Sequence, residues 1–468
     1  MSALNSTEPR NAHRKPIAAC ISSIFALAAP TAYATTFVTN CNDAGVGSLR
    51  TAVASAPDGD TIDATGLSGV CSTITLKTGA IVAGQNNLTI KGPGVGSLTV
   101  TAKYSNGMTT HQYQNRIFTH NGTGTLSLQD MTTSKGYQVS AAGNAFGGCI
   151  YSKGSVSLNN VNVTFCQART TSGSAVGGGI YTKGGLTMLY SNLSGNTANG
   201  GTSGGSIAGG ANVGTSMTAK YSSLVVNSAT NSAGTAGLIG AAFTHGNTFI
   251  RNTTISGNSS GDNVGGLAVV ASTGQVTLLN STISGNTSQN GIVGGIYAFA
   301  PAIKVYNSTL AFNTAASGSA GSPPGAQLLV SGASPAIVLE SSILANNTYG
   351  AGAVDNDLSA AGATISGHNN LIRASTASLP ADTIVGKCPL LKPLKSNGGL
   401  TQTHSLYGHS PAIDVGNNTF GSGFDQRGSM TANGVRDFAR VSGPAADIGA
   451  LEVDQTDEIY DSSFEGCP

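Results

Sequence analysis

The sequence contains no tryptophan and very little charge. Only 9% of its 468 residues are charged, against about 25% in typical soluble domains. The formal net charge is +1, so there is no strongly basic field to hold nucleic acid or an anionic membrane. The 65 glycines exclude a helical solenoid, because glycine is a poor helix former. Hydrophobic residues make up 39% of the chain, too many for a disordered chain, and this composition favours an elongated β-structure with thin layers.

The first 34 residues predict a secretory signal peptide. Three basic residues, Arg10, Arg14 and Lys15, precede an apolar stretch at 17–29, and Ala32–Ala34 supplies a small-x-small cleavage site. No later run reaches the roughly 18 apolar residues that a membrane-spanning helix needs. We therefore expect a bacterial protein that is secreted or held at the cell surface, without a transmembrane span. The sequence does not indicate an oligomeric state.

Six cysteines follow the predicted signal peptide, and an even number in an exported chain favours disulfides. Six cysteines allow 15 pairings. Proximity in the sequence favours Cys41–Cys71, Cys149–Cys166 and Cys388–Cys467. No C-x-x-C or C-x-x-H spacing occurs, so we expect no metal site at these cysteines.

A short motif recurs through the middle of the chain. The stretch "NSTISGNTS" at 280–288 has a close copy at 252–260, "NTTISGNSS". Aligned on the last asparagine of the motif, the copies are 27 to 33 residues apart. Internal periods of this length are typical of solenoids. The asparagine series comprises Asn196, Asn227, Asn258, Asn286, Asn313 and Asn346.

Short alternating apolar and polar runs separate these asparagines and read as strands broken by turns. A unit of this length with three short strands fits one coil of a right-handed parallel β-helix, in which equivalent strands pair about 4.8 Å apart along the axis. The asparagines would then stack as a ladder of amides at a turn. The Asn-x-Ser/Thr sequons at Asn280 and Asn286 are better explained by this repeat than by glycosylation. One apolar position should form an internal column: Val163, Leu193, Leu224, Ile255, Ile283, Leu310 and Ile343.

The two ends of the solenoid should be covered, because open strand edges promote aggregation. The stretch 47–56 places Leu49, Ala52 and Val53 on one helical face after Ser48, which predicts a short N-terminal capping helix. We predict an all-β parallel β-helix with that capping helix and a C-terminal cap. The expected division is 1–34 signal peptide, 35–105 N-terminal cap and first coils, 106–372 β-helix repeats, 373–453 C-terminal cap and 454–468 acidic tail.

Three parts of the chain resemble known families. The stretch "CNDAGVGSLRTAVASAPDGDTI" (41–62) resembles the N-terminal region of CSLREA-type and polymorphic-outer-membrane-protein-like bacterial surface proteins. The stretches 398–418, "GGLTQTHSLYGHSPAIDVGNN", and 436–453, "RDFARVSGPAADIGALEV", resemble the choice-of-anchor Q domain. The repeats between them are similar to pectin-lyase-like right-handed β-helix proteins. These resemblances imply a secreted β-helix surface protein.

Carboxylates are scarce in the repeats. Between residues 147 and 347 only Asp262 and Glu340 are acidic, and they fall in different coils. Hydrolysis of a glycosidic bond needs two carboxyl groups about 5–9 Å apart, and the resemblance to pectin-lyase-like proteins brings none of their catalytic signatures. His245 is the only histidine there, and a surface or turn position is expected for it. We predict no catalytic residues in the repeats.

Two other segments concentrate polar side chains. An aromatic and basic cluster within 111–121, formed by His111, Tyr113, Arg116 and His120, is a weak candidate for binding a sugar, and the alternative is a loop folded on the wall. The mixed charges between Asp414 and Glu452 predict an ion-paired cap. A calcium site that also uses Asn417 and Asn418 is the alternative; otherwise we expect no cofactor.

The same C-terminal region contains Ser405, His409 and Asp414, the residue types of a hydrolase triad. Such short spacing in one loop does not predict triad geometry.

These observations favour an exported, non-enzymatic surface or extracellular β-helix protein, an adhesin or glycan-binding scaffold. Its partners would be surface glycans or host and matrix macromolecules. The alternative is a polysaccharide lyase or glycoside hydrolase that acts on acidic polysaccharide.

Overall fold

The computed structural model describes residues 35–102, 115–201, 204–231, 237–316, 326–332, 334–350, 354–429 and 437–454. The predicted signal peptide lies outside these residues, and everything described belongs to one compact unit that begins at Ala34. In the described part of the chain, no helix has the length and apolar character needed to cross a membrane.

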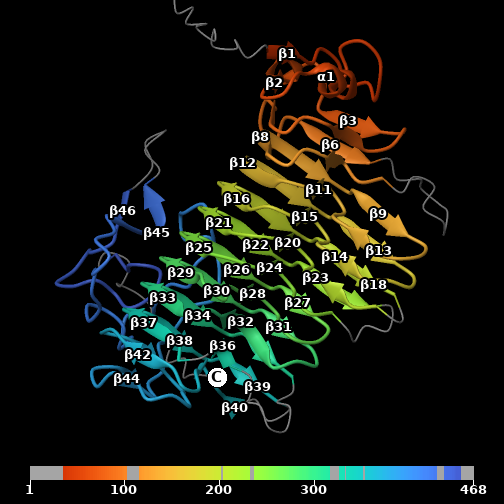
Figure 1. The fold of residues 1–468 in the computed structure, drawn as a ribbon. Coiled ribbons are helices and arrows are strands. Elements are labelled where there is room, and N and C mark those ends of the chain that lie inside the picture. Colours follow the sequence, from red (N-terminus) through yellow and green to blue (C-terminus); the bar gives the residue numbers. More distant parts are fainter. Residues whose placement is uncertain are drawn as a thin grey trace, which may run out of the picture. The chain divides into compact units, whose positions relative to one another are not determined.

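The unit is a parallel β-helix, as the sequence predicts (Figure 1). One coil contains β11 (Ile150–Ser152), the long strand β12 (Ser155–Thr164) and β13 (Gln167–Thr170). Each strand pairs in parallel with its equivalent one coil away; β12, for example, pairs with β8 (Thr125–Ser134) before it. Because pairing runs along the axis, equivalent residues of successive coils lie directly above one another.

The longest sheet has two rows of strands. The first row contains β1 (Thr35–Phe37), β2 (Thr61–Asp63), β5 (Leu88–Lys91), β8, β12, β16 (Leu186–Leu189), β21 (Met217–Lys220), β25 (Thr248–Arg251), β29 (Gln275–Leu279), β33 (Ala302–Tyr306), β37 (Ala336–Glu340) and β42 (Thr364–Ser366). The second row contains β3 (Thr73–Leu76), β6 (Thr99–Ala102), the ends of β8 and β12, β17 (Asn192–Ser194), β22 (Ser223–Val225), β26 (Thr254–Ser256), β30 (Thr282–Ser284), β34 (Thr309–Ala311), β38 (Ile343–Ala345), β43 (Leu371–Ile372) and β44 (Ile384–Val385).

Two further faces and a short sheet close the coils. The third face contains β4 (Ile81–Ala83), β7 (Phe118–His120), β11, β15 (Ile180–Thr182), β20 (Ala211–Val213), β24 (Ala242–Thr244), β28 (Leu267–Val270), β32 (Val293–Phe299), β36 (Ala326–Ser331) and β41 (Leu358–Ser359). The fourth face contains β9 (Tyr137–Ser140), β13, β18 (Thr197–Gly200), β23 (Ser228–Asn231), β27 (Ser259–Ser260), β31 (Thr287–Ser288), β35 (Thr314–Ala315), β39 (Thr348–Tyr349) and the antiparallel β40 (Val354–Asp355). The short sheet contains β10 (Ala145–Phe146), β14 (Ala175–Val176) and β19 (Ser206–Ile207).

Two turns with left-handed backbone flank each second-row strand from β17 to β38. In the coil of β30, Asn280 (φ 47°) precedes the strand and Gly285 (φ 63°) follows it. Asparagine and glycine tolerate this conformation better than most residues. The repeated motif therefore contains one complete second-row strand with both of its turns.

The predicted N-terminal helix is confirmed as α1 (Leu49–Ser55), and a short 3-10 helix, η1 (Thr65–Leu67), follows it. Ser48 is the N-cap, and its hydroxyl accepts a hydrogen bond from the Thr51 amide. Leu49, Ala52 and Val53 are buried against the first coils. The helix thus covers apolar surface that an open end would expose.

The predicted internal column is correct except in its last member. Ile283 pairs with Leu310, and Leu310 pairs with Leu344 rather than with Ile343. Ile343 instead pairs with Thr309, at the outward position of the second row. It is buried there because the C-terminal part of the chain covers it.

The C-terminal segment, which we define as residues 388–454, does not stay at the end of the solenoid. After β44 the chain lies along the outside of the second row (Figure 1). The amides of Asn252, Asn280 and Asn307 donate hydrogen bonds to backbone carbonyls of this segment at 2.7 to 3.0 Å. A small hairpin of β45 (Phe424–Ser429) and β46 (Asp437–Ala439) belongs to the segment. The region expected as an end cap is therefore largely a lateral cover.

Candidate functional site

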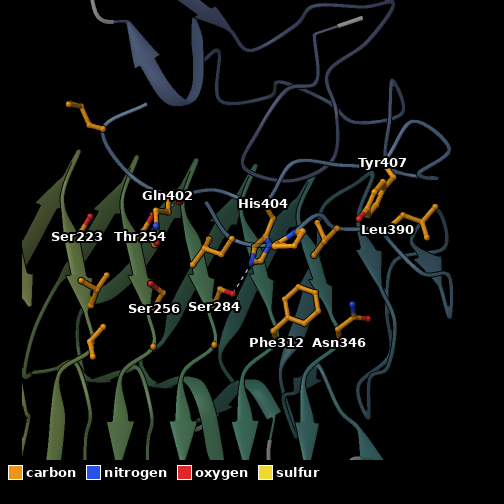
Figure 2. Close-up of a pocket in the computed structure, with 18 of the residues that line it drawn as sticks. Ser223, Thr254, Ser256, Ser284, Phe312, Asn346, Leu390, Gln402, His404 and Tyr407 are labelled. Atoms are coloured by element: carbon orange, nitrogen blue, oxygen red, sulfur yellow. Dashed lines mark hydrogen bonds between the residues drawn. The ribbon is translucent and has the colours of Figure 1, made fainter. Parts of the chain in front are cut away.

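A groove of about 900 Å³ lies between the outer face of the second row and the C-terminal segment (Figure 2). Its floor consists of outward-pointing residues of β22, β26 and β30, including Thr254, Ser256 and Ser284. Their inward neighbours Ile255 and Ile283 are fully buried in the core. Alternation along each strand therefore presents hydroxyl groups to the groove, repeated from coil to coil.

The left-handed turn residues after the second row form one edge of this floor. Val226, Gly257, Gly285, Phe312 and Asn346 occupy this position in successive coils. A side chain added at Gly285 would meet no atom closer than 3.9 Å, so space is open above this part of the floor. The edge thus has two glycines at its centre, between Val226 on one side and Phe312 and Asn346 on the other.

The opposite wall is mostly apolar. The C-terminal segment contributes Leu390, Leu391, Pro393, Leu394, Leu400 and Tyr407. Gln402 and His404 interrupt this wall and face the strand residues, as Figure 2 shows. The groove therefore has hydroxyls on its floor and hydrocarbon on its wall.

The groove continues along the axis toward the N-terminus. A second hollow of about 460 Å³ shares Asn192, Ser223 and Leu400 with the first. It contains Tyr190 and Tyr221, whose rings stack at 5.3 Å with an interplanar angle of 22°. Tyr190 is 48% exposed, so this end of the groove offers an accessible aromatic side chain.

The groove is free of formal charge. Among the residues that the structure describes, none that lines either hollow is Asp, Glu, Lys or Arg. Ser223 and Ser256 have hydroxyls with no hydrogen-bond partner in the described part of the chain. These hydroxyls are therefore available to a ligand.

His404 is the histidine of the groove, and it is held on both sides. Its Nδ1 lies 2.6 Å from the carbonyl oxygen of Lys392, and its Nε2 lies 2.8 Å from Oγ of Ser284. A carbonyl only accepts, so Nδ1 carries the proton and Nε2 of the neutral ring accepts from the Ser284 hydroxyl. Burial lowers the pKa of His404 to about 4, and the hydrogen bond to Lys392 opposes this shift. The ring is therefore neutral at pH 7.

Comparisons with known proteins identify no family for this chain. No protein-family model matches the sequence, and no curated protein matches it. Among solved structures, a crystal structure of pectate lyase Pel9A aligns with 90% of this chain and 97% of its own, at 14% identity and a TM-score of 0.40. The parallel β-helix of this chain is established by its own strand pairing.

The predicted aromatic and basic cluster does not form one surface. His111 and Tyr113 lie outside the described residues. His120 is fully buried, because alternation along β7 points it inward; its Nδ1 lies 2.7 Å from Ser152 Oγ, and its Nε2 lies 2.9 Å from the Gln85 carbonyl oxygen. The hypothesis that His120 contacts a sugar is therefore wrong.

Arg116 lies on the outside of the third face, where it fixes neighbouring backbone. Its Nε lies 3.0 Å from the Gly147 carbonyl oxygen, and NH2 lies 2.5 Å from the Phe146 carbonyl oxygen. Its guanidinium carbon lies 5.0 Å from the Tyr151 ring centre, and burial lowers the pKa of Arg116 to about 10. These contacts agree with the alternative given in the sequence analysis, in which this segment is a loop folded on the wall of the β-helix.

The asparagine series forms a continuous internal ladder. Nδ2 of each member donates to Oδ1 of the next at 2.7 to 3.0 Å, from Asn196 through Asn227, Asn258, Asn286 and Asn313 to Asn347. Asn346 does not join the ladder. It occupies the left-handed turn position (φ 58°), so the following asparagine takes the place predicted for it. Nδ2 of Asn347 then donates to Asp357 Oδ1 at 2.7 Å.

Two of the predicted disulfides are present, Cys41–Cys71 and Cys149–Cys166. Cys388 is disulfide-bonded as well. Its predicted partner Cys467 lies outside the described residues, so that pairing stays a prediction.

Three carboxyl groups of the C-terminal segment, Asp414, Asp447 and Glu452, lie within 4.8 Å of one another. Their oxygens already hold donors: Asp447 accepts the amides of Asp414 and Val453, and Glu452 accepts the Asp447 amide. The fully buried Arg440 also donates to Glu452 at 3.2 Å. A calcium ion would compete with these donors, and a calcium site here stays a prediction. The cluster forms an ion-paired core of the C-terminal segment, as the mixed charges predict.

The scarce acidic residues of the repeats lie away from the groove. Glu340 is at the end of β37, 3.5 Å from Thr419 Oγ1, and Asp262 follows β27 on the fourth side of the coil. Neither lines the hollows. No carboxyl pair of the kind a glycosidase uses is present among the described groove residues.

Sequence reasoning missed the groove, although one signal was present. Outward second-row positions are hydroxylic at Thr254, Thr282 and Thr309 but apolar at Ile343. A change from polar to apolar at a solvent-facing column indicates that something covers the later coils. Which segment covers these coils depends on contacts between residues about 110 to 170 positions apart, and the local sequence does not show them.

Proposed function

We propose that this chain is an exported β-helix protein of the cell surface or extracellular space that binds a neutral glycan chain along the groove. The observation that carries the proposal is the lining of the groove, which combines hydroxyls and hydrocarbon without any charged side chain. A sugar chain has the same two-sided chemistry, with hydroxyl edges and apolar ring faces.

The periodicity of the floor supports a chain-like ligand. Ser256 and Ser284 occupy equivalent positions in adjacent coils. Coils repeat about every 4.8 Å, which is close to the length of one pyranose unit in an extended chain. A polymer lying along the axis would therefore meet equivalent hydroxyls at two successive sugars, with Val225 and Ala311 at this position in the coils on either side.

Tyr190 supplies the aromatic contact that sugar rings favour. One face of its ring stacks on Tyr221, and almost half of the residue surface is open to solvent. Aromatic side chains add buried area at low entropic cost, because two side-chain angles fix them. The ligand is expected to begin at this end of the groove.

The lining argues against an acidic polysaccharide as the ligand. Uronate chains need cationic groups or bound calcium to offset their charge. The described residues of the groove offer neither, so a neutral chain meets a smaller desolvation cost.

The test is a glycan array followed by calorimetry with the mature protein. Neutral oligosaccharides should bind, and uronate oligosaccharides of the same length should bind at least several-fold more weakly. Replacing Tyr190 by Ala should weaken binding of the neutral chain about tenfold, since an aromatic contact is worth about 1 kcal/mol beyond its area.

The matched control is Tyr151→Ala. Tyr151 and Tyr181 form a similar stack at 5.5 Å and 11° on the third face, away from the groove. This variant should bind like the wild type. Equal losses in both variants, or a preference for uronates, would contradict the proposal.

A further inference from the structure

We propose that Ser284 and His404 form a nucleophile–base pair that hydrolyses carboxylic esters carried by the ligand of the groove. This inference rests on the proposed function for the nature of that ligand, an O-acylated neutral glycan. The pair itself stands on its own geometry.

The hydrogen-bonding order is that of an activated serine. Lys392 O accepts from Nδ1 of His404 at 2.6 Å, and Nε2 lies 2.8 Å from Oγ of Ser284. A third group that orients the base, followed by a base within reach of a hydroxyl, is the general arrangement for nucleophilic catalysis. Here a backbone carbonyl takes the orienting place that a carboxylate often has.

The base is in the correct protonation state. His404 is 4% exposed and its ring centre lies 5.1 Å from that of Phe312, so the ring sits in an apolar setting. A neutral imidazole with a free Nε2 lone pair can take the serine proton.

The pair borders open space. Ser284 is only 3% exposed, but both residues line the groove, and Gly285 directly after the serine leaves room above it. Ser256 holds the equivalent position one coil earlier and has no histidine partner among the residues that the structure describes. The chain therefore contains two similar serines, of which one is paired with a base.

A donor for the developing oxyanion is available on the same wall. Gln402 is exposed, lies two residues before His404 on the same extended stretch and lines the groove (Figure 2). Its side-chain amide has no hydrogen-bond partner in the described part of the chain. We assign to this amide the stabilisation of negative charge on the substrate oxygen.

The reaction balances with water alone. Oγ of Ser284 adds to the ester carbonyl carbon while its proton passes to Nε2 of His404. The carbon–oxygen bond to the sugar breaks, and the sugar hydroxyl takes that proton. Water then adds to the acyl-serine and gives a proton to His404, and the acid leaves as the serine oxygen regains its proton.

The first experiment is covalent labelling of the mature protein with an alkyl fluorophosphonate, read by intact mass and peptide mapping. One label should attach at Ser284. Ser284→Ala should lose it, whereas the matched control Ser194→Ala, in the same outward column but outside both hollows, should be labelled like the wild type. Circular dichroism checks that each variant is folded. Absence of label on folded wild-type protein, or equal labelling of Ser256, would overturn the proposal.

The second experiment measures turnover of p-nitrophenyl acetate. Ser284→Ala should lower kcat/KM at least about 100-fold, as loss of a catalytic serine does. A His404→Gln variant that stays folded should lose labelling as well. Turnover unchanged by Ser284→Ala would count against the pair.

The experiments can overturn the glycan-binding proposal and the nucleophile–base proposal independently. Binding of unmodified neutral oligosaccharides by a protein that takes no label overturns the nucleophile–base pair and leaves the glycan groove. Labelling at Ser284 without glycan binding supports the pair and overturns the assigned ligand.

Discussion

Two asparagines of the repeated motif have different roles, although both belong to Asn-x-Ser/Thr sequons. In "NSTISGNTS", Asn280 lies in the left-handed turn, and its amide holds the Phe424 carbonyl at 2.8 Å. Asn286 points inward and bonds Asn313 and the Ile255 carbonyl. Both are fully buried, so neither is available as a glycosylation acceptor in the folded chain.

Replacing Asn258 or Asn286 by Ala should destabilise the protein by about 1–3 kcal/mol each, because each change leaves buried backbone groups without partners. Denaturant unfolding followed by circular dichroism measures this. Asn199→Ala, at a half-buried position on the fourth face outside the ladder, should change stability by less than about 0.5 kcal/mol. Equal effects at the two kinds of site would contradict a role for the ladder in stability.

The raised pKa of Asp357 predicts an unusual pH dependence of the stability of the folded protein. Burial raises its pKa to about 7, and hydrogen bonds from Asn347 and Ala374 oppose this. The folded state therefore binds a proton more readily than the unfolded state, whose pKa is 3.8. This contribution to stability is full below the unfolded pKa and is lost as pH rises through 7.

Asp357→Asn should remove that component, since an amide cannot titrate. The melting temperature of the wild type should fall by several degrees more than that of the variant between pH 5 and pH 8, and the variant should be the more stable at pH 8. Differential scanning calorimetry across this range is the measurement. Parallel curves for the two proteins would show that Asp357 titrates normally.

At the level of elements, a second ladder, made of Ser and Thr hydroxyls, accounts for the hydrogen bonding of the turns before the second-row strands. The amide of Ser191 donates to Ser222 Oγ, that of Thr253 to Ser281 Oγ, and that of Ser281 to Ser308 Oγ, at 3.1 to 3.3 Å. These hydroxyl residues each follow a left-handed turn residue. The hydroxyls satisfy amides that no strand partner reaches, so both turns of the motif are bonded from coil to coil.

The coils could be predicted from the sequence because the information is local and repeated. Period, strand alternation and glycine at the turn identified the fold and most of the ladder, and the apolar face after Ser48 identified the capping helix. The end of the ladder could not be assigned, because Asn346 and Asn347 are adjacent and only the backbone turn distinguishes them.

The groove and the Ser284–His404 contact could not be predicted. They depend on where the C-terminal segment rests, and that is decided by hydrogen bonds between residues far apart in the sequence, such as Thr254 with Gln402, 148 positions apart. The hypothesis of one binding surface around Arg116 was wrong because it relied on residues that are neighbours in the sequence. Alternation within a three-residue strand sent His120 inward, although its neighbours in sequence suggested one surface.

The attachment of the C-terminal segment can be tested through its asparagine contacts. Asn252→Gly with Asn280→Gly keeps the left-handed backbone and removes the side chains that bond residues 424–426. Amide hydrogen exchange should become faster in 424–429 and remain slow in the internal strands. The control Asn160→Gly changes the same turn position in a coil where the side chain bonds Asp130 of the preceding coil and, within the described residues, nothing in the C-terminal segment.

If exchange in the C-terminal segment were unchanged by the double substitution, other contacts would hold it. Glycan affinity should fall in the double variant, because the segment forms one wall of the groove.

At the scale of the whole molecule, the groove and the solenoid share one direction. The lining runs from the coil of Asn160 to that of Asn346, a distance of about 29 Å at 4.8 Å per coil. Affinity should therefore rise with oligosaccharide length up to about six sugars and then level off. Calorimetry with a series of two to eight units measures this. A plateau at two units would indicate a local site instead of an extended groove.

The asparagine ladder also has a direction. One hydrogen of each Nδ2 donates to the next amide toward the C-terminal end, and the other donates to a backbone carbonyl of the preceding coil. Each Oδ1 faces the preceding coil, so the side-chain amide dipoles point the same way along the axis. Their positive end meets the carboxyl of Asp357, and their negative end begins at Asn196, which accepts the Cys166 amide. Aligned dipoles polarise one another. The interior of this weakly charged protein therefore carries an electric polarity of its own along the axis, and at its positive end the Asn347 amides oppose the rise that burial causes in the pKa of Asp357.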